Sequence, residues 1–278
     1  MSAPILVTGG TGTLGRLVVP RLREARCRVR VLSRRSHAPG DGVEFIIGDL
    51  ATGAGLDSAV AGVGTIVHLA GSAKGDEEKA RQLVRAASRA GARHLVYISV
   101  VGADRIPVVG GVDRAMFGYF AAKRGAERVV ADCGLPWTTL RATQFHDLTL
   151  ATLRQMAKLP VVPVPAGFRF QPVDAGEVAA RLVELALGQP AGLVPDIARP
   201  RVYGMAELLR GYLRASHRHQ LILPVRLPGE AARAIRAGAN LAPERAVGCR
   251  TWEDFLAARV GSPSDSRSGP TKRPADAG

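Results

Sequence analysis

Three residues near the middle of the sequence have the types and spacing needed for proton transfer. Tyr119 and Lys123 are four positions apart, so in a helix their side chains share one face and lie one turn apart. Ser99 ends an apolar run twenty positions earlier. A free phenol has a pKa of about 10, and a neighbouring cation lowers that pKa by favouring the phenolate. We therefore predict that Ser99, Tyr119 and Lys123 are catalytic; the alternative is an ordinary surface tyrosine and lysine.

A glycine-rich segment near the amino terminus has the spacing of a phosphate-binding loop. It comprises Gly9, Gly10, Thr11, Gly12, Thr13, Leu14 and Gly15. Gly10, Gly12 and Gly15 fit the G-x-G-x-x-G pattern, and the segment lies between an apolar run and an amphipathic one. Such glycines let the backbone approach a pyrophosphate, which the free N–H groups at a helix N-terminus then bind. We predict a dinucleotide cofactor here; a glycine-rich connection without a ligand is the alternative.

The end of the second expected strand has two arginines where a site for NAD usually has an acid. Ser33, Arg34 and Arg35 follow the glycine loop by about 20 residues, where such an acid would bind the ribose 2′-hydroxyl. Guanidinium groups favour a 2′-phosphate instead. We therefore predict NADP(H) in preference to NAD(H), unless these arginines only form a solvated surface.

Two further strand ends are expected at the same edge of the sheet. Asp49, followed by Leu50, ends the third strand, and its carboxylate could accept a hydrogen bond from the adenine amino group. A role as a helix cap is an equal alternative for Asp49. Leu69, Ala70 and Gly71 end the fourth strand, where small residues would allow the cofactor to lie close to the backbone.

Short β-branched runs alternate with amphipathic segments, which is typical of a parallel sheet flanked by helices. We expect strands over residues 4–8, 28–32, 44–47, 65–69, 94–99 and 137–141. Helices are expected over residues 15–25, 56–61, 77–90 and 119–133, and later over 148–159, 177–187, 205–215 and 229–239. Residues 161–165 contain too much proline for a central strand. Residues 261–278 are almost without apolar side chains, and we expect a disordered tail there.

The composition limits the classes of partner and compartment. The formal net charge is +14, concentrated in residues 16–35, with eight arginines against one acid, and residues 199–250, with ten against three. Three cysteines without CxxC spacing and scattered histidines predict no metal site. The second basic segment lacks the interleaved aromatics of a nucleic-acid platform. We expect a cytoplasmic protein with no membrane and no nucleic-acid partner, and the basic segment leaves an acidic substrate or partner open.

Taken together, the TGGTGTLG loop, Ser99 and the Tyr119–Lys123 pair resemble the short-chain dehydrogenase/reductase superfamily. The stretches VYISVVGAD, AERVVADCGLPWTTLRATQFHD and RFQPVDAGEVA resemble its atypical, NmrA-like NAD(P)-binding branch, over about residues 3–260. This resemblance implies an α/β fold, with a Rossmann-type doubly wound parallel sheet and a small mixed C-terminal substrate lobe. Residues 1–260 would form one domain, with the lobe mainly in residues 142–172 and 195–260.

The resemblance also implies a role for each candidate residue. Tyr119 would donate or accept the proton, Ser99 would polarise a substrate carbonyl, and Lys123 would hold the nicotinamide ribose. Many members of the branch have lost the tyrosine or the lysine, and the presence of both favours turnover here. The asparagine that completes a tetrad elsewhere in the superfamily has no match that we can place.

Gln144, Phe145 and His146 follow the sixth strand and are expected to contact the substrate. Core packing is the alternative for Phe145, and a structural role is the preferred alternative for His146. The function expected is that of an NADPH-dependent oxidoreductase that reduces a carbonyl or quinone-like small molecule. A non-catalytic NADP(H)-binding redox sensor and a nucleotide-sugar epimerase or dehydratase are the alternatives. A second copy of the chain or a regulatory protein remains a candidate partner.

Overall fold

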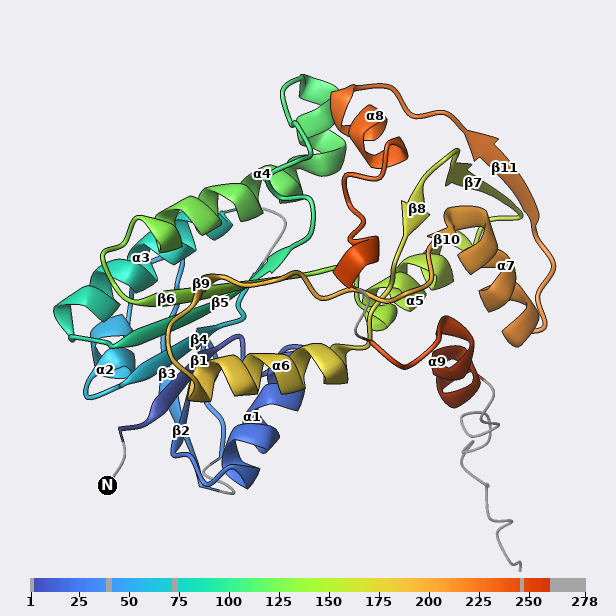
Figure 1. The fold of residues 1–278 in the computed structure, drawn as a ribbon. Helices are drawn as coiled ribbons and strands as arrows, with labels where there is room; N and C mark the ends of the chain where they lie inside the picture. The colour runs from blue at the N-terminus through green and yellow to red at the C-terminus, as the bar shows by residue number, and fades with distance from the viewer. Residues whose placement is uncertain (1–2, 39–41, 72–74, 246–247, 261–278) are drawn as a thin grey trace, which may run out of the picture.

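A seven-stranded parallel sheet forms the centre of the computed structural model, which describes residues 3–38, 42–71, 75–245 and 248–260 (Figure 1). Its strands are β1 (Ile5–Thr8), β2 (Val29–Ser33), β3 (Val43–Ile47), β4 (Thr65–His68), β5 (His94–Val100), β6 (Trp137–Ala142) and β9 (Gly192–Leu193). Their order in the sheet is β3-β2-β1-β4-β5-β6-β9, and all six neighbouring pairs are parallel. The chain runs outward from β1 in both directions, which confirms the Rossmann-type doubly wound fold.

Helices cover both faces of this sheet (Figure 1). One face is covered by α1 (Gly15–Glu24) and α6 (Ala175–Leu187). The other is covered by α2 (Leu56–Val60), α3 (Asp76–Arg89) and α4 (Gly111–Ala131). Val7 packs into the first of these cores and Leu6 into the second. Burial of both sheet faces explains why the central strands are continuous apolar runs.

Helix α4 begins earlier than the sequence indicates. We expected a helix over residues 119–133, which would have placed Tyr119 at its start, but α4 has 21 residues and starts at Gly111. Its first turn is stabilised by the buried Asp113 carboxylate, which accepts hydrogen bonds from the N–H groups of Gly110 (3.5 Å) and Ala231 (3.2 Å). The glycines in this turn weaken the helical pattern of the sequence. Tyr119 therefore lies in the middle of a long helix.

The remaining elements form a lobe beyond the carboxyl edge of the sheet (Figure 1). Helices α5 (His146–Met156), α7 (Met205–Ala215) and α9 (Trp252–Arg259) share one core, and α8 (Glu230–Arg236) packs against α4. The lobe also contains the 3-10 helix η1 (Pro243–Arg245). Its strand pairs are β7 (Val161–Pro165) with β11 (Leu221–Val225), and β8 (Arg169–Phe170) with β10 (Tyr203–Gly204).

Strand β7 illustrates how a proline-rich segment can still pair. It lies in a two-stranded sheet rather than in the central one, where a missing proline N–H can be tolerated. The tail expected over residues 261–278 lies outside the described residues. Within the described ranges, no helix is long and apolar enough to cross a membrane.

Candidate functional site

The Lys123 ammonium lies at the centre of the candidate site. Lys123 is on α4 and is only 4% exposed. Its Nζ is 3.2 Å from Oδ2 of Asp76, the first residue of α3. It also donates hydrogen bonds to the Tyr97 hydroxyl (3.3 Å) and the Ile98 carbonyl (3.4 Å), both on β5. Burial lowers the pKa of Lys123, and the Asp76 carboxylate opposes this effect. The ammonium is therefore held by α3 and β5 at the carboxyl edge of the sheet.

Tyr119 lies next to this ammonium, one turn earlier on α4. Lys123 Nζ is 5.8 Å from the centroid of the Tyr119 ring, and Tyr119 remains 39% exposed. Burial of the phenol, with a contribution from Asp76, raises the pKa of Tyr119 to about 12. The sequence led us to expect a lowered pKa because of Lys123, but Asp76 compensates the charge of that lysine. The phenol is therefore protonated at neutral pH, as a proton donor must be.

Ser99 and Gln144 present buried polar atoms without partners. Ser99 is on β5 and is 4% exposed, and its Oγ makes no hydrogen bond within the described residues. Gln144 follows the adjacent strand β6, and its Oε1 is likewise buried and unpaired. Buried polar atoms normally have partners, and exceptions are frequent at functional sites. These two atoms are candidates for binding a ligand.

A second layer of the site was missed by sequence reasoning. The Thr8 hydroxyl and Nδ1 of His68 are 2.7 Å apart, and the His68 ring stacks on Tyr97 at 5.3 Å between centroids. Burial, and then the charges of Lys123 and Lys79, lower the pKa of His68 to about 3. The neutral His68 ring therefore supports Tyr97, which in turn receives the Lys123 hydrogen bond. The only sequence signal for His68 was its place at the end of a strand.

The glycine loop has the shape that close contact with a pyrophosphate requires. Gly9 has φ of +70°, and a Cβ there would lie 2.7 Å from the backbone nitrogen of Ala70. A Cβ on Gly15 would overlap the carbonyl oxygen of Gly9. Helix α1 starts at Gly15 with no side-chain cap and no acid in its first turn, and Gly12 is exposed. This helix N-terminus fits an anionic ligand.

The residues after β2 are partly engaged with one another. The Ser33 hydroxyl is 2.9 Å from Nε2 of His37 and accepts a hydrogen bond from the Arg35 N–H (3.2 Å). The side chains of Arg34 and Arg35 are exposed and make no ion pair with any described residue. Arg30 instead binds Glu44 (2.9 Å) and nearby carbonyls. Arg30 is therefore not available to bind a 2′-phosphate, although it is one of the eight arginines of residues 16–35.

The other two strand ends differ in how close they come to the Lys123 centre. Oδ1 of Asp49 accepts a hydrogen bond from the Ala51 N–H (2.9 Å), and Leu50 is buried. Leu69 and Ala70 are half-buried after β4. Gly71 is next to the ammonium, since a Cβ there would lie 2.9 Å from Lys123 Nζ. Gly71 therefore places the end of β4 against the site.

Comparison with known proteins agrees with this geometry. A family model described as NAD(P)H-binding matches residues 9–188, which include the glycine loop, Ser99, Tyr119 and Lys123. The chain belongs to this NAD(P)H-binding family. The NAD(P)-binding part of the resemblance is thereby confirmed, and a short-chain dehydrogenase/reductase superfamily protein from Agrobacterium tumefaciens has the same fold, at 20% identity and a TM-score of 0.67.

Two relatives of the NAD(P)H-binding chain are reductases by name. The (4-alkanoyl-5-oxo-2,5-dihydrofuran-3-yl)methyl phosphate reductase of Streptomyces griseus subsp. griseus is 35% identical over 151 residues, which cover 53% of this chain and 50% of that protein. The match thus spans about half the length of that curated relative. The ceramide reductase of Caulobacter vibrioides is 30% identical over 227 residues, which cover 74% of this chain and 68% of that protein.

A solved structure shows the same fold. The NADPH-dependent quinone oxidoreductase of Escherichia coli, in complex with NADPH, superposes with a TM-score of 0.76 at 19% identity. The match covers 91% of this chain and 99% of that protein. The NAD(P)H-binding chain therefore has the fold of an NAD(P)H-dependent reductase.

His146 and Phe145 of this NAD(P)H-binding protein both pack against apolar or aromatic side chains. His146 is fully buried, with its ring 5.7 Å from that of Trp252 and 5.0 Å from that of Phe255. Phe145 is half-buried against the core beneath α6. The structure does not bring His146 together with Tyr119, because the start of α5 turns its ring toward α9. We therefore leave His146 out of the proposed site.

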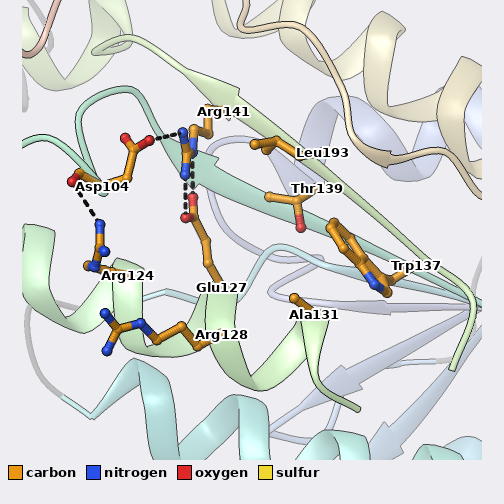
Figure 2. A pocket seen from close by; sticks show the side chains of 9 residues that line it. All are labelled: Asp104, Arg124, Glu127, Arg128, Ala131, Trp137, Thr139, Arg141 and Leu193. Atoms are coloured by element: carbon orange, nitrogen blue, oxygen red, sulfur yellow. Dashed lines mark hydrogen bonds and ion pairs between the residues drawn. The ribbon is translucent and has the colours of Figure 1, made fainter. Parts of the chain in front are cut away.

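A separate pocket of about 250 Å³ lies between the second half of α4 and the strands β6 and β9, next to one edge of the sheet (Figure 2). None of the three predicted catalytic residues lines it. The Arg141 guanidinium is held there by Glu127 (2.8 and 2.7 Å) and by Asp104 (2.9 Å). The hydrogen bonds to Glu127 raise the pKa of Arg141 further. This cluster fixes α4 to β6 and so helps to position Tyr119 and Lys123.

Proposed function

We propose that the protein is an NADPH-dependent oxidoreductase that reduces the carbonyl or quinone-like group of a small molecule. The observation that carries this proposal is the protonated phenol of Tyr119 beside the buried ammonium of Lys123. A protonated acid next to a fixed cation is suited to give its proton to a developing oxyanion. The reductase names of the two relatives and the quinone oxidoreductase neighbour support the same reaction class.

The cofactor would be bound by residues at the carboxyl edge of the sheet. The N–H groups at the start of α1, which Gly9 and Gly15 hold close to β1, would bind the pyrophosphate. Arg34 and Arg35 would bind the 2′-phosphate, and Lys123 would hold the nicotinamide ribose. When bound, reduced nicotinamide supplies a hydride to the substrate carbon.

Five side chains would then bind the substrate oxygen, transfer the proton or stabilise the charge. Tyr119 donates its phenolic proton to the substrate oxygen, and the Ser99 hydroxyl donates a hydrogen bond to the same oxygen. The Lys123 ammonium stabilises the phenolate that remains on Tyr119. Asp76 keeps that ammonium in place, since the two groups are 3.2 Å apart. The unpaired Oε1 of Gln144 would accept a hydrogen bond from the substrate.

The Tyr119→Phe variant tests the reaction. We expect it to lose at least about a hundredfold in NADPH consumption with a panel of quinones and aldehydes, while its affinity for NADPH stays near that of the wild type. Tyr212→Phe is the matched control, because Tyr212 is a buried tyrosine of α7 far from the ammonium. Equal turnover by wild type and Tyr119→Phe would overturn the proposal.

The same assay separates the two alternatives. Tight NADPH binding without turnover on any substrate of the panel would favour the redox sensor. Interconversion of nucleotide sugars without net NADPH consumption would favour the epimerase.

Cofactor preference is tested separately with Arg34→Ala. We expect this variant to lose affinity for NADPH by about tenfold or more, with little change for NADH, because a charge-assisted hydrogen bond to phosphate is lost. Arg23→Ala removes an equal charge from an exposed position on α1 and serves as the control. Equal losses for both cofactors would contradict the 2′-phosphate assignment.

A further inference from the structure

The small sheet of β7 and β11 is apolar on both of its faces. Val162 and Val164 are buried and pack, with Ile222, into the core of the lobe. The opposite face is formed by Val161, Pro163, Leu221, Leu223 and Val225. On that face Leu221 is 72% exposed, Leu223 52% and Val161 43%. We refer to these five residues as the outer face.

The outer face is continuous across the two strands. Leu221 pairs with Val161 and Leu223 pairs with Pro163, so their side chains form one surface. A strand with one solvated face normally alternates apolar and polar residues. Here the solvated positions are aliphatic, and contiguous exposed apolar patches of this kind mark interaction sites.

Basic side chains lie at one end of the outer face. At the end where β11 begins, a cavity of about 740 Å³ is lined by Arg210, Arg214, Arg218 and two histidines together with Leu221. Leu221 thus belongs to both the cavity and the outer face. No acidic residue lines the cavity, and no described residue forms an ion pair with these arginines.

The acids that flank these segments in sequence pair with arginines that do not line the cavity: Asp147 with Arg259, Asp174 with Arg250, Glu207 with Arg201 and Glu230 with Arg233. Residues 208–229, which include most of α7 and all of β11, contain four arginines and no Asp or Glu. Residues 148–173, which include β7, contain Arg154, Lys158 and Arg169 and again no acid. The four arginines of residues 208–229 belong to the second basic segment, residues 199–250, whose role the sequence left open.

We propose that the outer face and its basic rim bind the surface of an anionic phospholipid bilayer. The aliphatic side chains would enter the boundary between head groups and acyl chains, and the arginines would bind lipid phosphates. Our expectation from sequence of no membrane partner rested on the lack of a spanning segment, and a peripheral contact needs none.

The charge distribution disfavours the other occupants. A two-fold contact between copies of this chain would cover the aliphatic side chains but would offer the arginines of the cavity no acidic partner from the same face, because no acidic residue lines the cavity or the outer face. A single-stranded nucleic acid would need aromatic side chains for stacking, and the outer face has none. Exposed aliphatic side chains next to arginines without acidic partners instead match a bilayer surface, where acyl chains lie directly beneath phosphate groups.

Vesicle flotation tests the proposal with the full chain. We expect the wild type to float with vesicles of phosphatidylcholine mixed with phosphatidylglycerol, and not with phosphatidylcholine alone. Arg214→Gln combined with Arg218→Gln should weaken binding by about tenfold or more, because each basic residue near an anionic surface contributes measurably. Leu221→Ser combined with Leu223→Ser should also weaken it. Added salt should release the protein from the vesicles. Inorganic phosphate at the same ionic strength should release no more protein than the salt does, because the proposed ligand is the bilayer surface and not free phosphate.

Two control variants keep the test specific. Arg23→Gln removes an exposed charge from α1, and Leu187→Ser removes an exposed leucine from the end of α6. Both should bind vesicles like the wild type, and NADPH binding by every variant reports that the fold is intact. Equal binding to both vesicle types, or wild-type binding by both double variants, would overturn the proposal. Self-association that is lost in Leu221→Ser/Leu223→Ser, without vesicle binding, would assign the face to a second copy instead.

Discussion

Lys123 and Asp76 form a buried ion pair beneath the proposed active site, with 3.2 Å between Nζ and Oδ2. Their side chains are only 5% and 3% exposed. The pair has two consequences. It offsets the desolvation of the ammonium, and it weakens the field that Lys123 exerts on Tyr119. The phenol therefore keeps its proton until a second positive charge, such as that of an oxidised nicotinamide, is close to it.

Replacement of the carboxylate by an amide tests this relationship. In Asp76→Asn the ammonium stays buried without its counter-charge, and we expect the free energy of unfolding to fall by about 3 kcal/mol. Since Asp76 contributes to the raised pKa of Tyr119, the pKa of the phenol should fall in the variant. Urea denaturation measures the first effect, and the alkaline limb of the pH–rate profile, shifted to lower pH, measures the second.

Two further variants control for that experiment. Asp57→Asn removes a carboxylate whose partner, Arg89, is exposed, and we expect a loss below about 1 kcal/mol. Asp76→Asn combined with Lys123→Met should regain stability without regaining activity, because no charge is then left buried. An unchanged denaturation midpoint and an unchanged pH profile in Asp76→Asn would show that the pair controls neither property.

The glycine at the start of α1 is predicted to be essential for cofactor binding. In Gly15→Ala the new methyl group would meet the backbone of Gly9 and Gly10, which cannot rotate away. We expect the loop to shift and the affinity for NADPH to fall by more than about tenfold. A fluorescence titration with NADPH measures the affinity.

A second helical glycine provides the matched control. Gly118 lies within α4, and a Cβ there would meet nothing within 4 Å. Gly118→Ala should stabilise the fold by about 0.5–1 kcal/mol, because alanine is the better helix former. If Gly15→Ala bound NADPH as tightly as Gly118→Ala, the tight approach at Gly15 would have no functional role.

The features predicted from the sequence are those with a local cause. The first strands and the glycine loop were placed to within about one residue, since β-branched runs and glycine spacing act over a few positions. The spacing of Tyr119 and Lys123 likewise placed both residues on one helix, α4. The cap of α6 has a cause of the same local kind, since Oδ1 of Asp174 accepts a hydrogen bond from the Gly176 N–H at 2.7 Å.

The features missed depend on contacts between distant segments. Tyr97 receives the hydrogen bond of Lys123 from 26 positions away, and Asp76 joins the pair from a different helix. No pattern within β5 or α3 indicates these contacts. The start of α4 was missed because its Asp113 carboxylate, which caps it through the Gly110 N–H, is also held by a hydrogen bond from the Ala231 N–H of the distant helix α8. Helix α9 was missed as well, since it is short and has no clear apolar face in its sequence.

The Arg141–Glu127 pair is predicted to hold α4 in register with β6. Both side chains are nearly buried, and two hydrogen bonds join them. Glu127→Gln should lower the free energy of unfolding by about 2 kcal/mol, since Arg141 would keep only Asp104 as a charged partner. Chemical denaturation measures this, and kcat should fall because α4 carries Tyr119.

The exposed pair of Arg181 and Glu184 on α6 provides the comparison. Its groups are 2.9 Å apart, but their side chains are 44% and 65% exposed. Glu184→Gln should therefore cost less than about 0.5 kcal/mol. Equal losses in Glu127→Gln and Glu184→Gln would rule out a positioning role for Arg141.

His146 is predicted to make the fold sensitive to acid. Burial is the main reason that the pKa of its ring is lowered to about 4, whereas an unfolded histidine has a pKa of about 6.5. The unfolded chain therefore takes up this proton first as the pH falls. The stability due to neutral His146 is fully present above about pH 6.5 and is lost towards pH 4, by up to about 1.4 kcal/mol per pH unit.

The His146→Phe variant removes this proton uptake and keeps a flat ring between Trp252 and Phe255. Its free energy of unfolding, relative to that of the wild type, should rise by about 2 kcal/mol between pH 7 and pH 5. Urea denaturation at several pH values gives both curves, and groups that titrate equally in the two proteins cancel in the difference. If the two curves of unfolding free energy against pH were parallel, His146 would have the same pKa in the folded and the unfolded chain. The burial of His146 against α9 would then make no contribution to the pH dependence of stability.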